Sequence, residues 1–272
     1  MIPILTADSY RGVSADLSLS GLSSAQPVFI GRLLWPGDRQ PTDAVLKLYE
    51  SATCGIANEI IGYIANQLRS IDQPKRAAVV LLSKENLAGI STSLGPFVDK
   101  ATELVACWAT SLEQNTVPFK YIRQLPTFTP KQTKAFLQSK FCKRLSSVDH
   151  ATGNNDRHEG NFLYIDDLRY LAIDQGCVGG SVRWHSTWPN PSPRNELLEL
   201  AHRELQGTTL AEWTGEAILE HSKTQSEWAS IVQNIRANLA GLLDDDASVI
   251  IVDYMNERVS GNTFTANCGR LI

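Results

Sequence analysis

The chain has no surplus of basic residues. Its 272 residues include 25 Lys and Arg against 29 Asp and Glu, which gives a formal net charge of −4. A protein that neutralises a nucleic-acid backbone usually carries a cationic surplus, and attachment to anionic lipid calls for a cluster of lysines that this sequence lacks. We therefore expect neither direct nucleic-acid binding nor membrane attachment.

Closely spaced cysteines and export signals are also lacking. No two cysteines form a Cys-x-x-Cys pair, so neither a disulfide framework nor a compact metal site is indicated. The N-terminal segment reaches Asp8 too early for a signal peptide, and no stretch approaches a transmembrane span. These absences predict a cytoplasmic protein with reduced thiols, which are Cys54, Cys107, Cys142, Cys177 and Cys268.

What the chain does have is an ordinary globular composition. Apolar residues make up 43% and charged residues 20% of the sequence, and we find neither an internal repeat nor a low-complexity tract. This usage argues against disorder, and the length suffices for a substantial core divided between two lobes.

The most informative stretch runs from Asn154 to Gly176. It contains Asp156 and Asn161, followed by two short apolar runs that a turn of two acidic residues separates. Asp174 ends the second run. The pattern predicts a loop, a β-hairpin and an acidic loop, which would hold three oxygen-bearing side chains at one end of the hairpin.

Such a set of side chains fits phosphoryl transfer from ATP with Mg²⁺. In that chemistry one Asp orients the attacking hydroxyl, while an Asn and a second Asp hold the metal on the phosphates. This interpretation makes Asp156 the catalytic carboxylate and makes Asn161 and Asp174 the metal ligands. The alternative is a polar turn whose acids are simply solvated, since Asp-x-x-x-x-Asn alone often occurs by chance.

The same stretch resembles the catalytic and metal loops of atypical kinases. Two families match best, the phosphoinositide 3/4-kinase-like enzymes and the bacterial HipA-like serine/threonine kinases, and the small size of the chain favours the HipA-like group. The sequence differs from ordinary protein kinases in lacking both a His-Arg-Asp and an Asp-Phe-Gly tripeptide. The resemblance rests on two motifs, Asp156-Arg157-His158-x-x-Asn161 and Ile173-Asp174-x-Gly176.

The resemblance implies a fold, a cofactor and partners. The fold would be an α+β, two-lobed protein-kinase-like fold with a β-rich N-lobe and a mainly helical C-lobe. ATP and Mg²⁺ would be the cofactors, and a Ser or Thr hydroxyl of a protein would be the acceptor. A HipA-like enzyme also suggests a toxin or stress regulator with a small antitoxin partner. His158 would orient the loop or the phosphates.

A kinase also needs a lysine on a strand and a glutamate on the next helix to position the phosphates. The partial alternation of apolar residues over Asp43–Tyr49 predicts a strand that carries Lys47. An apolar stripe at helical spacing predicts a helix over Gly55–Arg69, with Glu59 at its margin. We expect an ion pair between Lys47 and Glu59, although each alone could be a surface residue.

Two further segments are candidates for nucleotide contacts. The stretch Tyr10–Asp16 is predicted to be a loop that covers the phosphates through Gly12, Val13 and Ser14, with Gly21–Gln26 as an alternative. A strand near Leu104–Trp108 is predicted to form the hinge between the lobes. Its residues Val105 and Cys107 would then line the adenine.

The predicted domains are an N-lobe over residues 1–110 and a C-lobe over residues 111–272. In the C-lobe we expect a helix from Pro130 to about Leu145 after an N-cap at Thr129. Separate helices are predicted over Thr209–His221 and Ser226–Leu243, the first opened by a capping box, and the C-terminal tail is predicted to be frayed.

Other functions remain open. The same lobes could phosphorylate a small molecule or a lipid, or transfer a nucleotidyl group, because the sequence does not separate the acceptors. A non-catalytic pseudokinase that binds a partner is a further alternative. The intact set of Lys47, Asp156, Asn161 and Asp174 argues against it.

Overall fold

The protein is of the α+β class, as predicted, and its chain divides into two compact units. The computed structural model describes residues 1–17, 26–166, 169–183 and 193–269. Unit 1 comprises Met1–Ile56 and Pro74–Gln114, and unit 2 comprises Ala57–Gln73 and Asn115–Ile272. The chain thus passes from unit 1 to unit 2 for the last time after Gln114, four residues beyond the predicted boundary at residue 110. The segment Ala57–Gln73, which the sequence assigns to the first domain, groups with unit 2.

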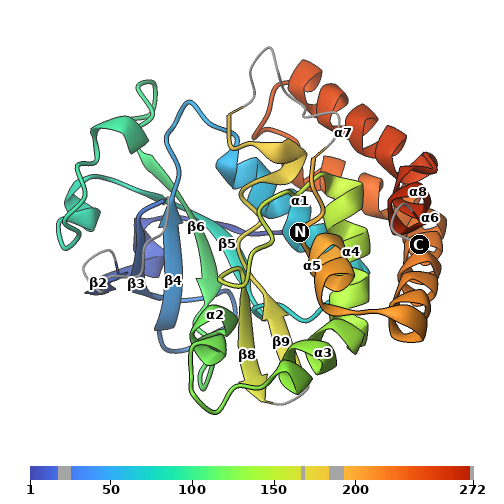
Figure 1. Cartoon of the computed structure of the whole chain (residues 1–272). Coiled ribbons are helices and arrows are strands. Elements are labelled where there is room, and N and C mark those ends of the chain that lie inside the picture. The colour runs from blue at the N-terminus through green and yellow to red at the C-terminus, as the bar shows by residue number, and fades with distance from the viewer. Residues whose placement is uncertain (18–25, 167–168, 184–192, 270–272) are drawn as a thin grey trace. The chain divides into compact units, whose positions relative to one another are not determined.

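Unit 1 is built on a six-stranded sheet in the order β1-β5-β6-β4-β3-β2 (Figure 1). Strand β1 runs parallel to β5, and all the other neighbours are antiparallel. The strands are β1 (Ile4–Leu5), β2 (Tyr10–Asp16), β3 (Val28–Leu33), β4 (Thr42–Leu48), β5 (Ala77–Leu82) and β6 (Val105–Ser111).

The core of unit 1 lies against this sheet. Apolar side chains that alternate along β3, β4, β5 and β6 join Leu5, Trp35, Leu87 and Phe97 in one buried cluster. In the described part of the unit, short 3₁₀ turns at Ala7–Ser9, Glu85–Leu87 and Gly95–Phe97 lie in the connections between strands. The alternation predicts the strand that carries Lys47, and β4 confirms that prediction.

The segment Tyr10–Asp16 is a strand, so the prediction of a phosphate-covering loop at Gly12, Val13 and Ser14 is wrong. Strand β2 pairs with β3 from Tyr10 to Asp16, with register shifts on both sides of Val13. Gly12 has a φ of 102°, which only glycine adopts easily, and it lies at the first irregularity. The alternative loop at Gly21–Gln26 lies, except for Gln26, outside the described residues.

The predicted adenine wall is also wrong, because Val105 and Cys107 are core residues of unit 1. Both side chains are fully buried in the apolar cluster. Strand β6 lies between β4 and β5, and Cys107 is paired with Leu48 on one side and Val80 on the other. The sheet therefore uses the backbone groups that a nucleotide base would need.

Unit 2 is mainly helical and contains a three-stranded sheet in the order β7-β8-β9. Its helices pack around the buried helix α4, which contacts α3, α5, α6 and α7 (Figure 1). The elements are α1 (Gly55–Leu68), β7 (Val117–Pro118), α2 (Phe119–Arg123), α3 (Pro130–Gln138), α4 (Lys140–Thr152), β8 (Phe162–Asp166), β9 (Arg169–Ala172), a 3₁₀ turn (Val178–Gly180), α5 (Glu196–Glu204), α6 (Gly207–Leu239), α7 (Asp245–Ser260) and α8 (Thr263–Gly269).

The helix predicted from Pro130 to about Leu145 is split in two at Ser139. The backbone of Ser139 is extended, with φ −64° and ψ 149°, and the Ser139 Oγ accepts a hydrogen bond from the amide of Cys142 at 3.1 Å. The same hydroxyl donates to the carbonyl of Phe136 at 2.5 Å. A serine that closes α3 and caps α4 therefore turns the chain where the apolar pattern alone predicts continuity.

The two helices predicted over Thr209–His221 and Ser226–Leu243 form a single helix. Helix α6 runs unbroken through the polar stretch 222–225. No Gly or Pro interrupts this stretch, and the hydroxyls of Ser222 and Thr224 each donate to the carbonyl four residues earlier, at 3.1 Å. The predicted capping box at Thr209 lies inside the helix, whose N-cap is Gln206. The tail that was expected to fray contains helix α8.

Candidate functional site

Strands β8 and β9 confirm the two predicted strands and their antiparallel pairing, with Phe162 opposite Ala172. The predicted turn includes Asp167, which lies outside the described residues. Beneath the hairpin the Phe162 ring stacks on Phe136 of α3 with centroids 4.5 Å apart, and Phe119 lies 5.0 Å from Phe162. Since such aromatic pairs add about 0.5–1.5 kcal/mol each, this cluster fixes the hairpin against α3.

Helix α4 leads directly into the predicted catalytic loop. It ends at Thr152, and Gly153 follows in the left-handed conformation with a φ of 68°. The amide of Gly153 caps the last carbonyls of α4, and a Cβ there would collide with Tyr254. The buried Asn154 accepts a hydrogen bond from the amide of Asp156 at 3.2 Å. The chain thereby turns from the buried Asn154 to the exposed Asp156, the predicted catalytic residue.

Asp156 and Asn161 lie at the two ends of a closed loop. The side chain of Asp156 is half exposed. Asn161 Nδ2 donates to the carbonyl of Asp156 at 2.6 Å, and the amide of Ile173 donates to the carbonyl of Asn161 at 3.1 Å. The loop is therefore tied to Ile173, which follows β9, and Asp174 is the next residue.

Arg157 holds the two predicted site loops together. Its side chain is fully buried and makes two hydrogen bonds of 3.0 Å to the carboxylate of Asp149 in α4. The Nη1 group donates to the carbonyls of Asn161 at 3.0 Å and Ile173 at 2.6 Å, and Nη2 donates to Gln175 Oε1. One guanidinium thus connects α4 with both loops. This is a structural role, in which Arg157 binds a carboxylate and backbone carbonyls.

Burial acts against the charged form of both members of this pair, and it raises the pKa of Asp149 despite the contacts with Arg157. Burial alone lowers the pKa of Arg157, but the ion pair with Asp149 outweighs burial, and the pKa lies above its usual value. Arg157 therefore stays protonated at every pH at which the protein is folded.

The second loop places Asp174 in an unusual conformation. Its φ is 58°, in the left-handed region that a non-glycine residue seldom adopts. The carboxylate accepts a hydrogen bond from the amide of Gly176 at 3.3 Å. Left-handed Asp is tolerated because its short side chain bonds locally, and strain of this kind concentrates at functional sites.

Helix α1 secures the same loop from the other side. The buried Glu59 accepts a hydrogen bond from the amide of Gln175 at 2.9 Å. Asn58 Nδ2 donates to the carbonyls of Gly176 at 2.7 Å and Ser181 at 2.9 Å. Gly62 lies directly against Gln175, so close that a Cβ would be 2.5 Å from that of Gln175.

Lys47 and Glu59 each have defined contacts within their own unit. Lys47 is buried on β4, and its ammonium lies 5.1 Å from the centroid of the Tyr49 ring. Glu59 accepts the hydrogen bond from the amide of Gln175 that is described above. The predicted ion pair joins residues of different units and stays a prediction.

His158 lies on the exposed side of the loop. Its Nδ1 accepts a hydrogen bond from the amide of Gly160 at 2.9 Å, which makes Nε2 the protonated nitrogen of the neutral ring. Nε2 lies 4.0 Å from Asp156 Oδ1. The ring also lines a pocket of about 300 Å³ with Lys120, Glu159, Phe162, Glu196, Leu200 and Arg203.

The donor set suits a magnesium ion that is also bound by phosphates. Asn161 donates through Nδ2, so its Oδ1 is an oxygen without a hydrogen bond to any described residue. Amide and carboxylate oxygens are the ligands Mg²⁺ prefers, and it usually takes only one or two from the protein. Among the described residues, no group of three or more His, Cys, Asp or Glu side chains is placed to hold a metal ion.

Sequence reasoning missed the residues that support the site. Asp149, Asn58 and Gln175 carry no recognisable motif. The partners of Asn58 are 118 and 123 residues away, whereas Asp149 and Gln175 bind Arg157 across 8 and 18 residues. The only available signal is the polar pair Asn58-Glu59 within the otherwise apolar first half of α1. Polar residues inside such a stripe require buried partners, and these are the backbone groups of the loop after Asp174.

No family model matches the chain, and no curated relative was found for it. The assignment of function consequently rests on the residues and their geometry. Within the described ranges, no helix combines the length and apolar character needed to cross a membrane. All five cysteines carry free thiols.

Proposed function

We propose that the protein is an ATP- and Mg²⁺-dependent phosphotransferase, similar to the HipA-like serine/threonine kinases, that transfers the γ-phosphoryl group to a protein hydroxyl. The observation that carries the proposal is the single buried guanidinium of Arg157, which bonds to both loops that hold Asp156, Asn161 and Asp174. Such fixed spacing between a catalytic carboxylate and metal ligands is what phosphoryl transfer requires.

Each residue has a role in this proposal. Asp156 is exposed enough to meet a hydroxyl, and it accepts the hydroxyl proton as the oxygen attacks the γ-phosphorus. The bond from phosphorus to the bridging oxygen breaks, and ADP leaves. Asn161 and Asp174 would hold Mg²⁺, which supplies charge neutralisation at the phosphates when bound. Catalysis then consists of positioning and electrostatic stabilisation.

Lys47 and Glu59 complete the set. Lys47 would steady the phosphates, and Glu59 would orient Lys47 while its carboxylate also holds the amide of Gln175. The division into a strand-rich unit and a mainly helical unit supports the two-lobed kinase-like fold that the proposal assumes. A protein acceptor, and a small regulatory partner of the antitoxin type, belong to this proposal.

The direct test is transfer of label from γ-labelled ATP in the presence of Mg²⁺. We expect label on a protein acceptor, or on the chain itself, and expect Asp156→Asn and Asp174→Asn to abolish it. Asp99→Asn is a matched control, because Asp99 is exposed and belongs to unit 1. Equal transfer by Asp174→Asn and the control would refute the assignment.

Two further measurements separate the alternatives. Label from α-labelled ATP would identify nucleotidyl transfer instead. A rise in melting temperature with Mg²⁺ and ATP, which Asp174→Asn removes, would show nucleotide binding independently of any acceptor. Binding without transfer to any protein, lipid or small-molecule acceptor would favour the pseudokinase.

A further inference from the structure

One segment of the chain departs from its acidic balance. Residues 114–148 contain seven Lys and Arg and not one Asp or Glu, in a chain of net charge −4. The segment forms α2, α3 and most of α4 in unit 2. A segment that carries charge of only one sign over such a length needs opposite charges, which other elements or a binding partner must supply. The cations are Lys120, Arg123, Lys131, Lys134, Lys140, Lys143 and Arg144.

Part of this segment borders a pocket of about 310 Å³ against α6. This volume lies at the lower end of the roughly 300–1,000 Å³ typical of small-ligand sites, so it suits a single side chain or small anion. Three lysines line it, and Leu219 beside them is 61% exposed. The lining residues are Gln138, Lys140, Lys143, Glu216, Leu219, Glu220 and Lys223.

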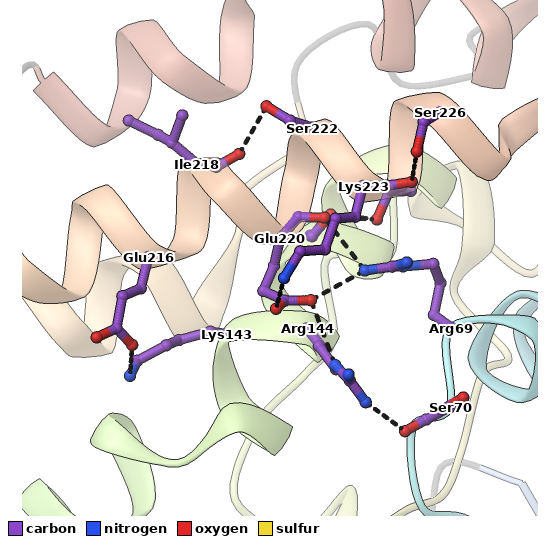
Figure 2. Close-up of polar contacts among 12 residues, drawn as sticks. Arg69, Ser70, Lys143, Arg144, Glu216, Ile218, Glu220, Ser222, Lys223 and Ser226 are labelled. Atoms are coloured by element: carbon purple, nitrogen blue, oxygen red, sulfur yellow. Dashed lines mark hydrogen bonds and ion pairs between the residues drawn. The ribbon is translucent and has the colours of Figure 1, made fainter.

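The carboxylate of Glu220 lies at the centre of the charges around this pocket (Figure 2). It accepts from Arg69 at 2.9 Å, from Arg144 at 3.2 Å and from Lys223 at 2.8 Å, while only 8% of its side chain is exposed. Burial raises the pKa of Glu220, but these cations outweigh burial and hold the pKa below its usual range. One negative charge is thus shared among three positive ones.

The other two carboxylates do not restore the balance. Glu227 binds Arg69 at 2.5 Å, and Glu216 binds Lys143. Lys140 is exposed and forms no ion pair with a described residue. The pocket lining holds three lysines and two glutamates. Together with the residues joined to this lining through ion pairs, the group has five cations and three carboxylates, namely Arg69, Lys140, Lys143, Arg144 and Lys223 against Glu216, Glu220 and Glu227.

We propose that this pocket binds an anionic side chain of a protein partner, best matched by a phosphorylated serine followed by an apolar residue. Lys140 and Lys223 would donate to the phosphate, and Leu219 would pack against the neighbouring side chain. Phosphate carries close to two negative charges near neutral pH, roughly the excess of cations around the pocket. The small volume and the single exposed leucine favour this occupant over a nucleic acid, which needs an extended basic track.

The test uses fluorescence anisotropy with a short labelled peptide that contains one phosphoserine before a leucine. The unphosphorylated peptide is the first control. Lys140→Gln/Lys223→Gln removes two cations from the pocket, and Lys84→Gln/Lys100→Gln removes two exposed cations of unit 1 that are not among the lining residues. We expect the first double variant to weaken binding by about tenfold or more, because hydrogen bonds to charged groups contribute roughly 1.5–3 kcal/mol each. The second should stay within about twofold of the parent.

The outcomes separate this site from the proposed phosphotransfer. Asp156→Asn should bind the phosphopeptide unchanged, and inorganic phosphate should compete with it. The proposal is overturned if the phosphopeptide does not bind, or if both double variants lose affinity equally. It is also overturned if a single-stranded oligonucleotide or a vesicle with anionic lipid binds more tightly than the phosphopeptide and loses that binding in Lys140→Gln/Lys223→Gln.

Discussion

Arg157 and Asp149 form a two-pronged ion pair in the interior of unit 2, with two hydrogen bonds of 3.0 Å and neither side chain more than 1% exposed. Such a pair adds little net stability, because both ions lose their hydration on burial. Its effect lies in geometry, since the planar guanidinium has further donors in fixed directions. Those donors reach Asn161 and Ile173, and the position of each site loop depends on them.

Removal of one member of this pair is expected to be costly. Arg157→Ala should lower the free energy of unfolding by about 3–5 kcal/mol, because Asp149 would remain buried without a partner. The double variant Asp149→Leu/Arg157→Met should recover much of that loss. Denaturant unfolding of the three proteins measures this directly.

The double variant also separates positioning from simple stability. It still lacks donors for the carbonyls of Asn161 and Ile173, so we expect it to fold and yet to lose the thermal shift with Mg²⁺ and ATP. Retention of the full shift would show that Arg157 does not position the loops.

Asp174 offers a test of backbone strain at the predicted metal ligand. Asp174→Ala places an alanine at a φ of 58°, whereas Asp174→Gly removes the penalty. We expect the glycine variant to be the more stable of the two by about 1 kcal/mol. Both should lose Mg²⁺-dependent ATP binding equally, because both lack the carboxylate. Unfolding curves and calorimetric titration provide the two readouts, and equal stability would mean that the loop relaxes.

Gly62 and Gly215 are helical glycines with opposite surroundings. A Cβ at Gly215 would meet nothing within 4 Å, whereas at Gly62 it would clash with Gln175. Gly215→Ala should therefore stabilise the protein by up to about 1 kcal/mol through helix propensity. Gly62→Ala should destabilise it and weaken Mg²⁺-dependent nucleotide binding by displacing the loop after Asp174. Thermal unfolding with and without nucleotide compares them, and a stabilising Gly62→Ala would contradict the close packing.

The buried histidines of unit 2 predict a loss of stability in mild acid. Burial, assisted by Arg258, lowers the pKa of His221 to about 4 and that of His150 to about 2. The unfolded chain binds these protons near pH 6.5. Stability is therefore fully present above about pH 6.5 and falls as the pH drops toward 4, by on the order of 3 kcal/mol for His221 alone.

The check is urea unfolding between about pH 7 and about pH 5. His221→Gln should show a shallower decline than the parent protein, while the contribution of His150 remains. An unchanged pH dependence in His221→Gln would exclude His221 as a source of the acid sensitivity.

Local patterns predicted much of the fold. The alternation around Lys47, the apolar stripe of α1 and the hairpin after Asn161 each correspond to an observed element, because each depends on residues close in sequence. The errors arose where one side chain or a distant strand decides the structure. Ser139 ends one helix and starts the next through its hydroxyl, and Tyr10–Asp16 is a strand only because β3 pairs with it.

The same distinction applies to the candidate site. The residues proposed to carry chemistry stand in a short motif and can be found from the sequence. The residues that hold them, Asp149, Asn58 and Gln175, form no motif, and Asn58 depends on a contact 118 residues away that leaves no local pattern. Arg157 belongs to the motif, yet its role is evident only from its five hydrogen-bond partners.

The loop that carries Asp174 is secured by Asn58 and Glu59, which precede its backbone groups by 118 and 116 residues. Ordering this loop thus requires the closure of a very long stretch of chain, and such contacts form late in folding. During synthesis, α1 emerges well before the segment that it must hold. Before that segment arrives, the buried polar groups of α1 have only water or other transient partners. The candidate site can therefore assemble only after the chain has been made beyond Gly176, so no part of it can be ordered by local folding of α1 alone.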